Sequence, residues 1–152
     1  MIRAAIVTVS DKGSQGQRED LSGPEAARIL ATAEIEVLSI QIVPDEVEEI
    51  KEILIELADR QEADIIVTTG GTGVSPRDVT PEATRAVLER EIPGMGEAMR
   101  RAGLEVTPHA MLSRALAGIR GRTLIVNLPG SPRGVRENLA VILPALSHAV
   151  AK

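Results

Sequence analysis

Short apolar segments rich in β-branched residues alternate along this chain with amphipathic segments, and this alternation restricts the possible fold more than any other feature. Strands are predicted over residues 2–9, 35–43, 63–69 and 123–127, and helices over residues 22–33, 45–60, 80–91 and 132–150. Strands that alternate with helices form parallel sheets whose faces the helices cover. A chain of 152 residues is long enough to bury such a core. We therefore predict one α/β domain over residues 1–152, with helices on both faces of a mostly parallel sheet.

Each of these helices begins at a residue type that is favoured at a helix start. The predicted N-caps are Ser22, Asp45, Thr80 and Ser131. Thr80 and Ser131 are each followed by proline, which is favoured at the first helical position. Prolines and glycines interrupt the pattern over residues 92–121, where short helices are predicted near residues 96–102 and 109–117.

The composition excludes several classes of site and partner. The chain has no cysteine, so disulfides, thiol catalysis and thiolate metal ligands are absent. A net charge of -5 and the absence of Phe, Tyr and Trp argue against nucleic acid as a partner, because its recognition relies on clustered cations and aromatic stacking. No signal peptide and no apolar run of about 20 residues is recognisable. We expect a soluble, cytoplasmic protein that does not bind membranes.

The strongest functional signal is the stretch TTGGTGVSPRDVTPE, over residues 68–82, where a glycine-rich loop joins a predicted strand to a predicted helix. The candidate phosphate-binding residues are Gly70, Gly71, Thr72 and Gly73. Glycines let the backbone approach a ligand closely, and backbone amides beside a helix start form an anion site. The alternative is a tight turn without a ligand. The loop matches neither the P-loop nor the dinucleotide fingerprint.

The carboxyl ends of parallel strands meet at one edge of a sheet, so four loops are expected to converge on one crevice. They are Ser10–Asp11, Pro44–Asp45, Gly70–Asp78 and Asn127–Ser131. Paired carboxylates beside a phosphate site suit Mg²⁺, which takes one or two carboxylates plus phosphate oxygens. Asp45 and Asp78 are the predicted pair. Asp45 has the alternative role of helix cap, and Asp11 that of a turn residue.

Other polar residues carry weaker signals. Ser113 is either an ordinary residue on a helix face or a ligand contact, and the sequence leaves both interpretations open. His109 and His148 have no second His or Cys at ligand spacing, so a structural role is favoured for both.

Five ordered blocks of the sequence resemble the MogA/MoaB family of molybdenum-cofactor biosynthesis, which also includes the G domain of gephyrin. The blocks are TVSD at residues 8–11, VPD at 43–45, residues 68–82, MLSR at 111–114 with AGIRG at 117–121, and NLPGSP at 127–132. The resemblance implies a three-layer αβα sandwich, the molybdopterin-binding fold. It also implies Mg²⁺-dependent transfer of AMP from ATP to the phosphate of molybdopterin, with release of pyrophosphate.

By this resemblance, Asp45 and Asp78 match the two functional aspartates and would hold the metal. Gly70 to Gly73, with Ser10 and Asp11, would bind the nucleotide phosphates. The expected molybdopterin-binding residues are Ser113, Asn127, Pro129, Gly130 and Ser131. The alternative function is that of a MoaB-type protein that binds molybdopterin with weak or no transferase activity.

The resemblance also implies self-association, as a homotrimer or alternatively a hexamer. Residues 139–150 are apolar around more than one helical face, which suits a helix that is partly buried against another subunit. The molybdenum-insertion protein is a candidate partner.

Overall fold

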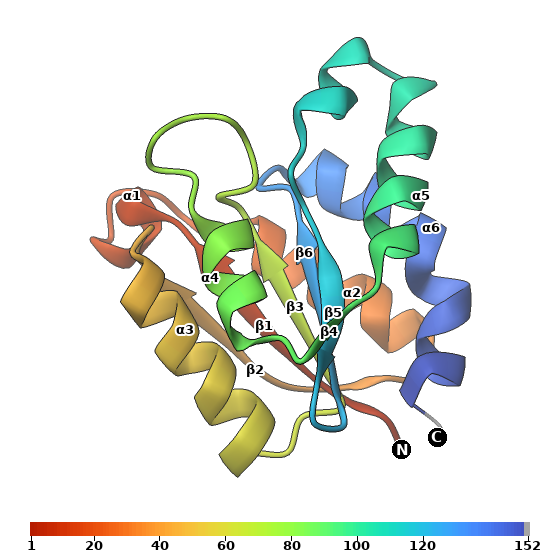
Figure 1. Ribbon diagram of the computed structural model, residues 1–152. Helices are drawn as coiled ribbons and strands as arrows, with labels where there is room; N and C mark the ends of the chain where they lie inside the picture. The colour runs from red at the N-terminus through yellow and green to blue at the C-terminus, as the bar shows by residue number, and fades with distance from the viewer. Residues whose placement is uncertain (151–152) are drawn as a thin grey trace.

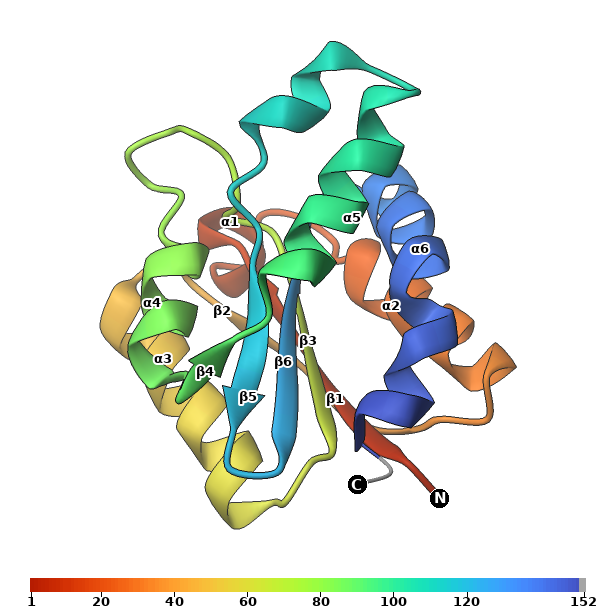
Figure 2. The same cartoon turned by 45° about the vertical axis from the view of Figure 1, so that its right-hand side comes forward.

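The computed structural model describes residues 1–150 as a six-stranded sheet between two helical layers (Figures 1 and 2). The strands are β1 (Arg3–Val9), β2 (Glu36–Val43), β3 (Ile65–Thr69), β4 (Arg90–Glu91), β5 (Ala117–Arg120) and β6 (Thr123–Leu128). Their order across the sheet is β2-β1-β3-β6-β5-β4. The pairs β2–β1, β1–β3 and β3–β6 are parallel, whereas β5 is antiparallel to both β6 and β4. The predicted three-layer fold with a mostly parallel sheet is confirmed.

The helices are α1 (Asp11–Ser14), α2 (Ser22–Thr32), α3 (Val47–Ile55), α4 (Thr80–Val87), α5 (Pro93–Leu104) and α6 (Pro132–Val150). A π-helical segment, η1 (Glu56–Arg60), continues α3, and a 3₁₀ turn, η2 (Pro108–Leu112), follows α5. Helices α2, α5 and α6 cover one face of the sheet, and α3 and α4 cover the other (Figure 2). Within residues 1–150, no helix has the length and apolar character that a membrane span requires.

Alternating side chains of the central strands enter two separate cores, as the period of two in a strand requires. In β1, Ala4 and Ile6 pack with α2 and α6, whereas Ala5 and Val7 pack with α3 and α4. The same alternation places neighbouring residues of β3 in opposite cores. Because both faces are buried, β1, β3 and β6 are apolar along almost their whole length. The sheet therefore forms a rigid base for the loops at its edge.

Three predicted helix starts are wrong in detail. Ser22 lies inside α2, whose first turn is instead capped by the side chain of Asp20, which accepts from the Gly23 amide at 3.0 Å. The hydroxyl of Thr80 donates to the Gly70 carbonyl at 2.9 Å and does not cap α4. Helix α3 begins at Val47, after an uncapped Glu46, so Asp45 is not its cap. The fourth prediction is confirmed, since Ser131 accepts from the Gly134 amide at the start of α6.

Residues 80–121 depart most from the prediction. Helix α4 ends at Val87, and the following residues form β4 rather than a further helical turn. The helix expected over 109–117 is only the short turn η2, followed by an extended segment that leads into β5. In β5, a Cβ atom on Gly118 would lie 2.4 Å from the Arg90 carbonyl oxygen. Glycine at this position therefore allows β4 to pair closely with β5.

Candidate active site

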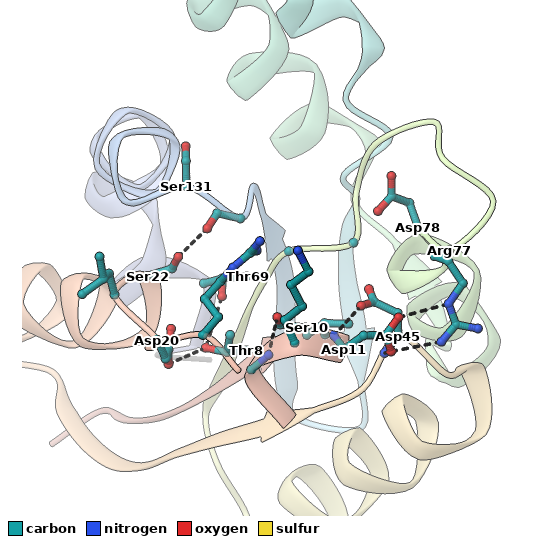
Figure 3. A pocket seen from close by; sticks show the side chains of 18 of the residues that line it. Thr8, Ser10, Asp11, Asp20, Ser22, Asp45, Thr69, Arg77, Asp78 and Ser131 are labelled. Atoms are coloured by element: carbon teal, nitrogen blue, oxygen red, sulfur yellow. Dashed lines mark hydrogen bonds and ion pairs between the residues drawn. The ribbon is translucent and has the colours of Figure 1, made fainter. Parts of the chain in front are cut away.

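The carboxyl ends of β1, β2, β3 and β6 surround a cavity of about 800 Å³. All four loops that were expected to converge contribute to its lining, so this prediction is confirmed. The predicted site residues found there are Ser10, Asp11, Asp45, Gly70, Gly71, Asp78, Gly130 and Ser131. Figure 3 shows Asp45 and Asp78 on one side of this crevice and Ser22 and Ser131 on the other.

Asp11 and Asp45 are joined by two reciprocal hydrogen bonds. The backbone amide of Asp11 donates to Oδ2 of Asp45, and the backbone amide of Asp45 donates to Oδ1 of Asp11, each at 2.9 Å. The two residues directly follow the parallel strands β1 and β2, whose last paired residues are Val9 and Val43. Asp45 is thus bonded to the loop that follows the neighbouring strand β1 rather than to its own helix, which removes its interpretation as a cap.

Arg77, at the far end of the glycine-rich loop, pairs with Asp11 and with Glu46 at 3.0 and 2.9 Å. The hydrogen bond from the guanidinium lowers the pKa of Asp11, and the amide of Asp45 lowers it further. The charge of Asp11 is therefore already matched by a cation of the protein. Four aspartates line the crevice: Asp11, Asp20, Asp45 and Asp78. Asp20 already accepts from the Gly23 amide and the Thr8 hydroxyl. Asp45 and Asp78 are the two that lie beside the glycine-rich loop, and neither has an arginine partner among the described residues.

Burial raises the pKa of Asp45, and the nearby carboxylates of Asp11 and Asp78 raise it further. Asp78 lies near the end of the glycine-rich loop, and its side chain accepts from the Ser75 amide at 3.0 Å. Both carboxylates closely approach glycines of the loop: a Cβ on Gly71 would lie 3.1 Å from Oδ1 of Asp45, and one on Gly73 would lie 2.9 Å from Oδ2 of Asp78. The glycines therefore let both carboxylates come close to the loop backbone.

The carboxylates of Asp45 and Asp78 fit a divalent cation whose other ligands are phosphate oxygens and water. A cation would offset the charge that burial and the neighbouring carboxylates disfavour on Asp45. Across residues 1–150, no group of three or more His, Cys, Asp or Glu side chains is arranged to hold a metal ion. Two carboxylates are enough for Mg²⁺ only when phosphate oxygens and water supply the other ligands.

The glycine-rich loop also offers unpaired donors. Among the described residues, the backbone amides of Gly71, Thr72 and Gly73 donate no hydrogen bond. Gly70 and Gly71 have positive φ angles of 94° and 69°, which turn the loop sharply at the end of β3. Free amides in such a turn are available to an anion.

A second cavity, of about 630 Å³, lies on the other side of this loop, against α5, η2 and the start of α6. The predicted residues that line it are Thr72, Gly73, Ser113, Pro129 and Ser131. Ser131 lines both cavities. Ser113 ends η2 in an extended conformation, so its interpretation as an ordinary residue on a helix face is wrong.

Asn127 is the predicted site residue that the structure does not bring to either cavity. Its side chain is completely buried: it donates to the hydroxyls of Thr68 and Thr84 at 3.0 Å, and it accepts from the Leu116 amide at 3.3 Å. These bonds tie β6 to β3, α4 and the segment before β5. The expectation that Asn127 contacts a ligand is therefore replaced by a structural role.

Sequence reasoning missed several residues that build the crevice. Asp20 accepts from the hydroxyl of Thr8 at 2.9 Å, and Ser22 donates to the Gly130 carbonyl. For Asp20 the sequence did contain a signal: it stands three residues before Gly23, the spacing at which an aspartate caps the first turn of a helix. Arg77 and Arg114 lie in stretches that were singled out in the sequence, but their roles could not be predicted, because their partners are distant in the sequence.

Comparison with known proteins shows which family has this arrangement. A family profile described as "Probable molybdopterin binding domain" matches residues 5–148. This chain belongs to the molybdopterin-binding domain family. The crystal structure of the molybdopterin biosynthesis enzyme MoaB from Thermus thermophilus superposes with a TM-score of 0.93 at 52% identity, and the match covers 100% of this chain and 98% of that one.

Molybdopterin adenylyltransferase of Helicobacter pylori strain J99 is 43% identical over 98% of this chain and 86% of its own length. Gephyrin of Dictyostelium discoideum is 45% identical over 95% of this chain, which spans only 21% of the length of that protein. The resemblance to the MogA/MoaB family that the five blocks indicated is thus confirmed.

Proposed function

We propose that this protein is a molybdopterin adenylyltransferase of molybdenum-cofactor biosynthesis, which uses ATP, molybdopterin and Mg²⁺. The observation that carries the proposal is the pair of cavities on the two sides of one glycine-rich loop, with Asp45 and Asp78 beside the loop. A transferase that joins two substrates needs a site for each and a place where their reacting groups meet. The similarity to the Helicobacter pylori enzyme supports the same activity.

The first cavity suits ATP. Its walls provide the free amide of Gly71, the carboxylates of Asp45 and Asp78 and the cations Lys12 and Arg18, which together match a polyphosphate with a bound divalent ion. Ser10 and Asp11 would shape the wall of this site, because their amides donate to the Val43 carbonyl and to the Asp45 carboxylate and their side chains bond to the Gly13 amide and to Arg77. Since the protein has no aromatic residue, the adenine packs against aliphatic groups and peptide planes.

The second cavity suits molybdopterin. Ser113 and Thr72 offer hydroxyl groups, and Pro129 and Ser131 line the side of this cavity that faces the first cavity. At this boundary the two loops touch through their backbones: a Cβ on Gly130 would lie 3.3 Å from the Cα of Gly70. Ser131, which lines both cavities, marks the boundary where the phosphates of the two substrates would meet.

In the proposed reaction, an oxygen of the molybdopterin phosphate attacks the α-phosphorus of ATP. The bond from this phosphorus to the oxygen that bridges to the β-phosphate breaks, and pyrophosphate leaves. The amides of Gly71, Thr72 and Gly73 would bind the phosphate oxygens, and the buried Thr80 hydroxyl holds the Gly70 carbonyl and so keeps the loop in shape. Mg²⁺, held by Asp45 and Asp78, would supply positive charge that offsets the phosphates.

The experiment that tests the function measures pyrophosphate release from ATP by purified protein with Mg²⁺ and molybdopterin. Release that depends on molybdopterin supports the transferase. Molybdopterin binding without release would support the alternative, a MoaB-type binding protein, and would contradict the proposal. Omission of Mg²⁺ and substitution of Asp78 by Asn are the matched controls.

We also propose self-association, as a homotrimer or a hexamer. In α6, Ala145 and Ala149 are exposed, and Val141, Leu143 and Val150 are only partly buried, which leaves apolar surface for a second copy. Light scattering gives the mass of the assembly. We further expect the protein in the cytoplasm, with the molybdenum-insertion protein as a candidate partner.

A further inference from the structure

One arginine holds both ends of the loop that carries Asp78. The Nε atom of Arg114 donates to the Gly73 carbonyl at 2.7 Å, and its Nη2 atom donates to the Asp78 carbonyl at 2.6 Å. The backbone amide of Arg114 donates to the Thr72 carbonyl at 2.8 Å. Arg114 thus contacts the loop both before the turn over residues 75–78 and at the last residue of that turn, Asp78.

Arg114 is itself held from two directions. Its Nη1 atom pairs with the Glu82 carboxylate of α4, and this hydrogen bond lowers the pKa of Glu82, so the pair is charged. On either side of Arg114, the carbonyls of Ser113 and Ala115 accept from Nη1 of Arg100 in α5, at 3.3 and 2.8 Å. The segment that carries Arg114 is therefore tied to two helices.

The other contacts of the loop are local or exposed. The Asp78 amide donates to the Ser75 carbonyl at 2.9 Å, and the Ser75 amide donates back to the Asp78 side chain. These bonds fix the shape of the loop but not its place on the protein. Arg77 does bond to Asp11 and Glu46 outside the loop, but through its side chain alone, which is 55% exposed against 37% for Arg114, and exposed ion pairs hold a geometry weakly. Arg114 adds hydrogen bonds to two backbone carbonyls of the loop.

We propose that Arg114 is a positioning residue, which sets the distance of the Asp78 carboxylate from Asp45 and thereby the affinity for the divalent cation. This inference rests on the proposed function. A guanidinium suits the task because its planar fork donates to two carbonyls and a carboxylate at once, whereas a lysine ammonium is a single point donor. Groups that orient metal ligands contribute strongly to metal affinity without contacting the metal.

The test compares the full-length wild type with Arg114→Lys and with a matched control, Arg120→Lys. Arg120 also pairs with a carboxylate, Asp59, and donates to a backbone carbonyl, that of Val87, but it lies at the opposite end of the sheet, in β5. Both substitutions keep the charge and remove an arginine fork. An effect that comes only from lower stability of the fold should therefore appear in both variants.

Three properties are measured. Electron paramagnetic resonance follows Mn²⁺ binding in the presence of α,β-methylene-ATP, calorimetry gives the affinity for this analogue without metal, and hydrogen exchange follows the amides of residues 74–78. Arg114→Lys is expected to weaken Mn²⁺ binding by about 10- to 100-fold and to speed exchange in the loop. Its metal-free affinity for the analogue should stay that of the wild type, and Arg120→Lys should match the wild type in all three.

Mn²⁺ affinity and loop exchange in Arg114→Lys that equal those of Arg120→Lys would overturn the assignment. So would a wild type that binds the analogue but no Mn²⁺. Failure of the proposed function looks different: the wild type would release no pyrophosphate with molybdopterin, yet the Mn²⁺ and exchange measurements would still decide the role of Arg114.

Discussion

Replacement of Gly71 by alanine tests whether the loop depends on the absence of a side chain. The φ angle of Gly71 is 69°, and a Cβ atom there would lie 2.2 Å from Oγ1 of Thr80. A left-handed backbone costs an L-residue about 1–2 kcal/mol. Displacement of the Thr80 hydroxyl breaks its buried hydrogen bond to the Gly70 carbonyl, which costs about 1–3 kcal/mol more. We therefore expect Gly71→Ala to lower the free energy of unfolding by about 2–5 kcal/mol.

The assay is urea unfolding followed by far-ultraviolet circular dichroism, since the protein has no aromatic residue to report by fluorescence. Gly121→Ala is the control, because Gly121 also has a positive φ, 58°, but a Cβ there would meet no atom within 4 Å. The free energy of unfolding of Gly121→Ala should fall only by the cost of the left-handed backbone, about 1–2 kcal/mol. Calorimetry should also show weaker ATP binding by Gly71→Ala. Equal losses of stability in the two variants would refute the steric reasoning.

Three further substitutions probe the crevice. Asp78→Asn should abolish pyrophosphate release with an unchanged circular dichroism spectrum; release at the wild-type rate would remove Asp78 from the metal site. Burial raises the folded-state pKa of Asp45, so in metal-free protein the folded state binds the proton more tightly, and stability falls as pH rises above the ordinary value of 3.8. Urea unfolding should therefore show Asp45→Asn to be more stable than the wild type at neutral pH, with the difference vanishing below 3.8; a difference independent of pH would contradict this. Asn127→Leu leaves three buried polar partners unpaired and should cost about 2–4 kcal/mol of stability, while the folded fraction still binds ATP normally.

The position of the site could be predicted from the sequence because it follows from a rule of topology. Parallel strands bring their carboxyl ends together, so Asp45 and Asp78 had to approach each other once the strands were recognised. The role of each side chain could not be predicted in the same way. Asp45, Thr80 and Ser22 stand where helix caps stand, but each bonds instead to a residue outside its own helix. The partners are Asp11, Gly70 and Gly130, respectively.

The missed elements have a similar cause. The short strands β4 and β5 are defined by their antiparallel pairing, β4 with β5 and β5 with β6, and the close approach that Gly118 permits cannot be seen along the chain. Asn127 occupies the end of an apolar strand, where a polar residue usually faces a ligand. Its partners Thr68 and Thr84 come from two other elements, and only their assembly shows that its hydrogen bonds are all satisfied within the protein.

The reciprocal hydrogen bonds between Asp11 and Asp45 have a consequence for motion. Each residue binds the backbone of the other, so the ends of β1 and β2 cannot fluctuate separately without breaking both bonds. The loop from Gly73 to Asp78 is instead held to the rest of the protein mainly through the side chains of Arg114 and Arg77. Picosecond-to-nanosecond amide order parameters should therefore be high at Asp11 and Asp45 and lower along the loop. Adaptation of the crevice to molecules of different size then falls to the loop, while the joined strand ends serve as a fixed reference.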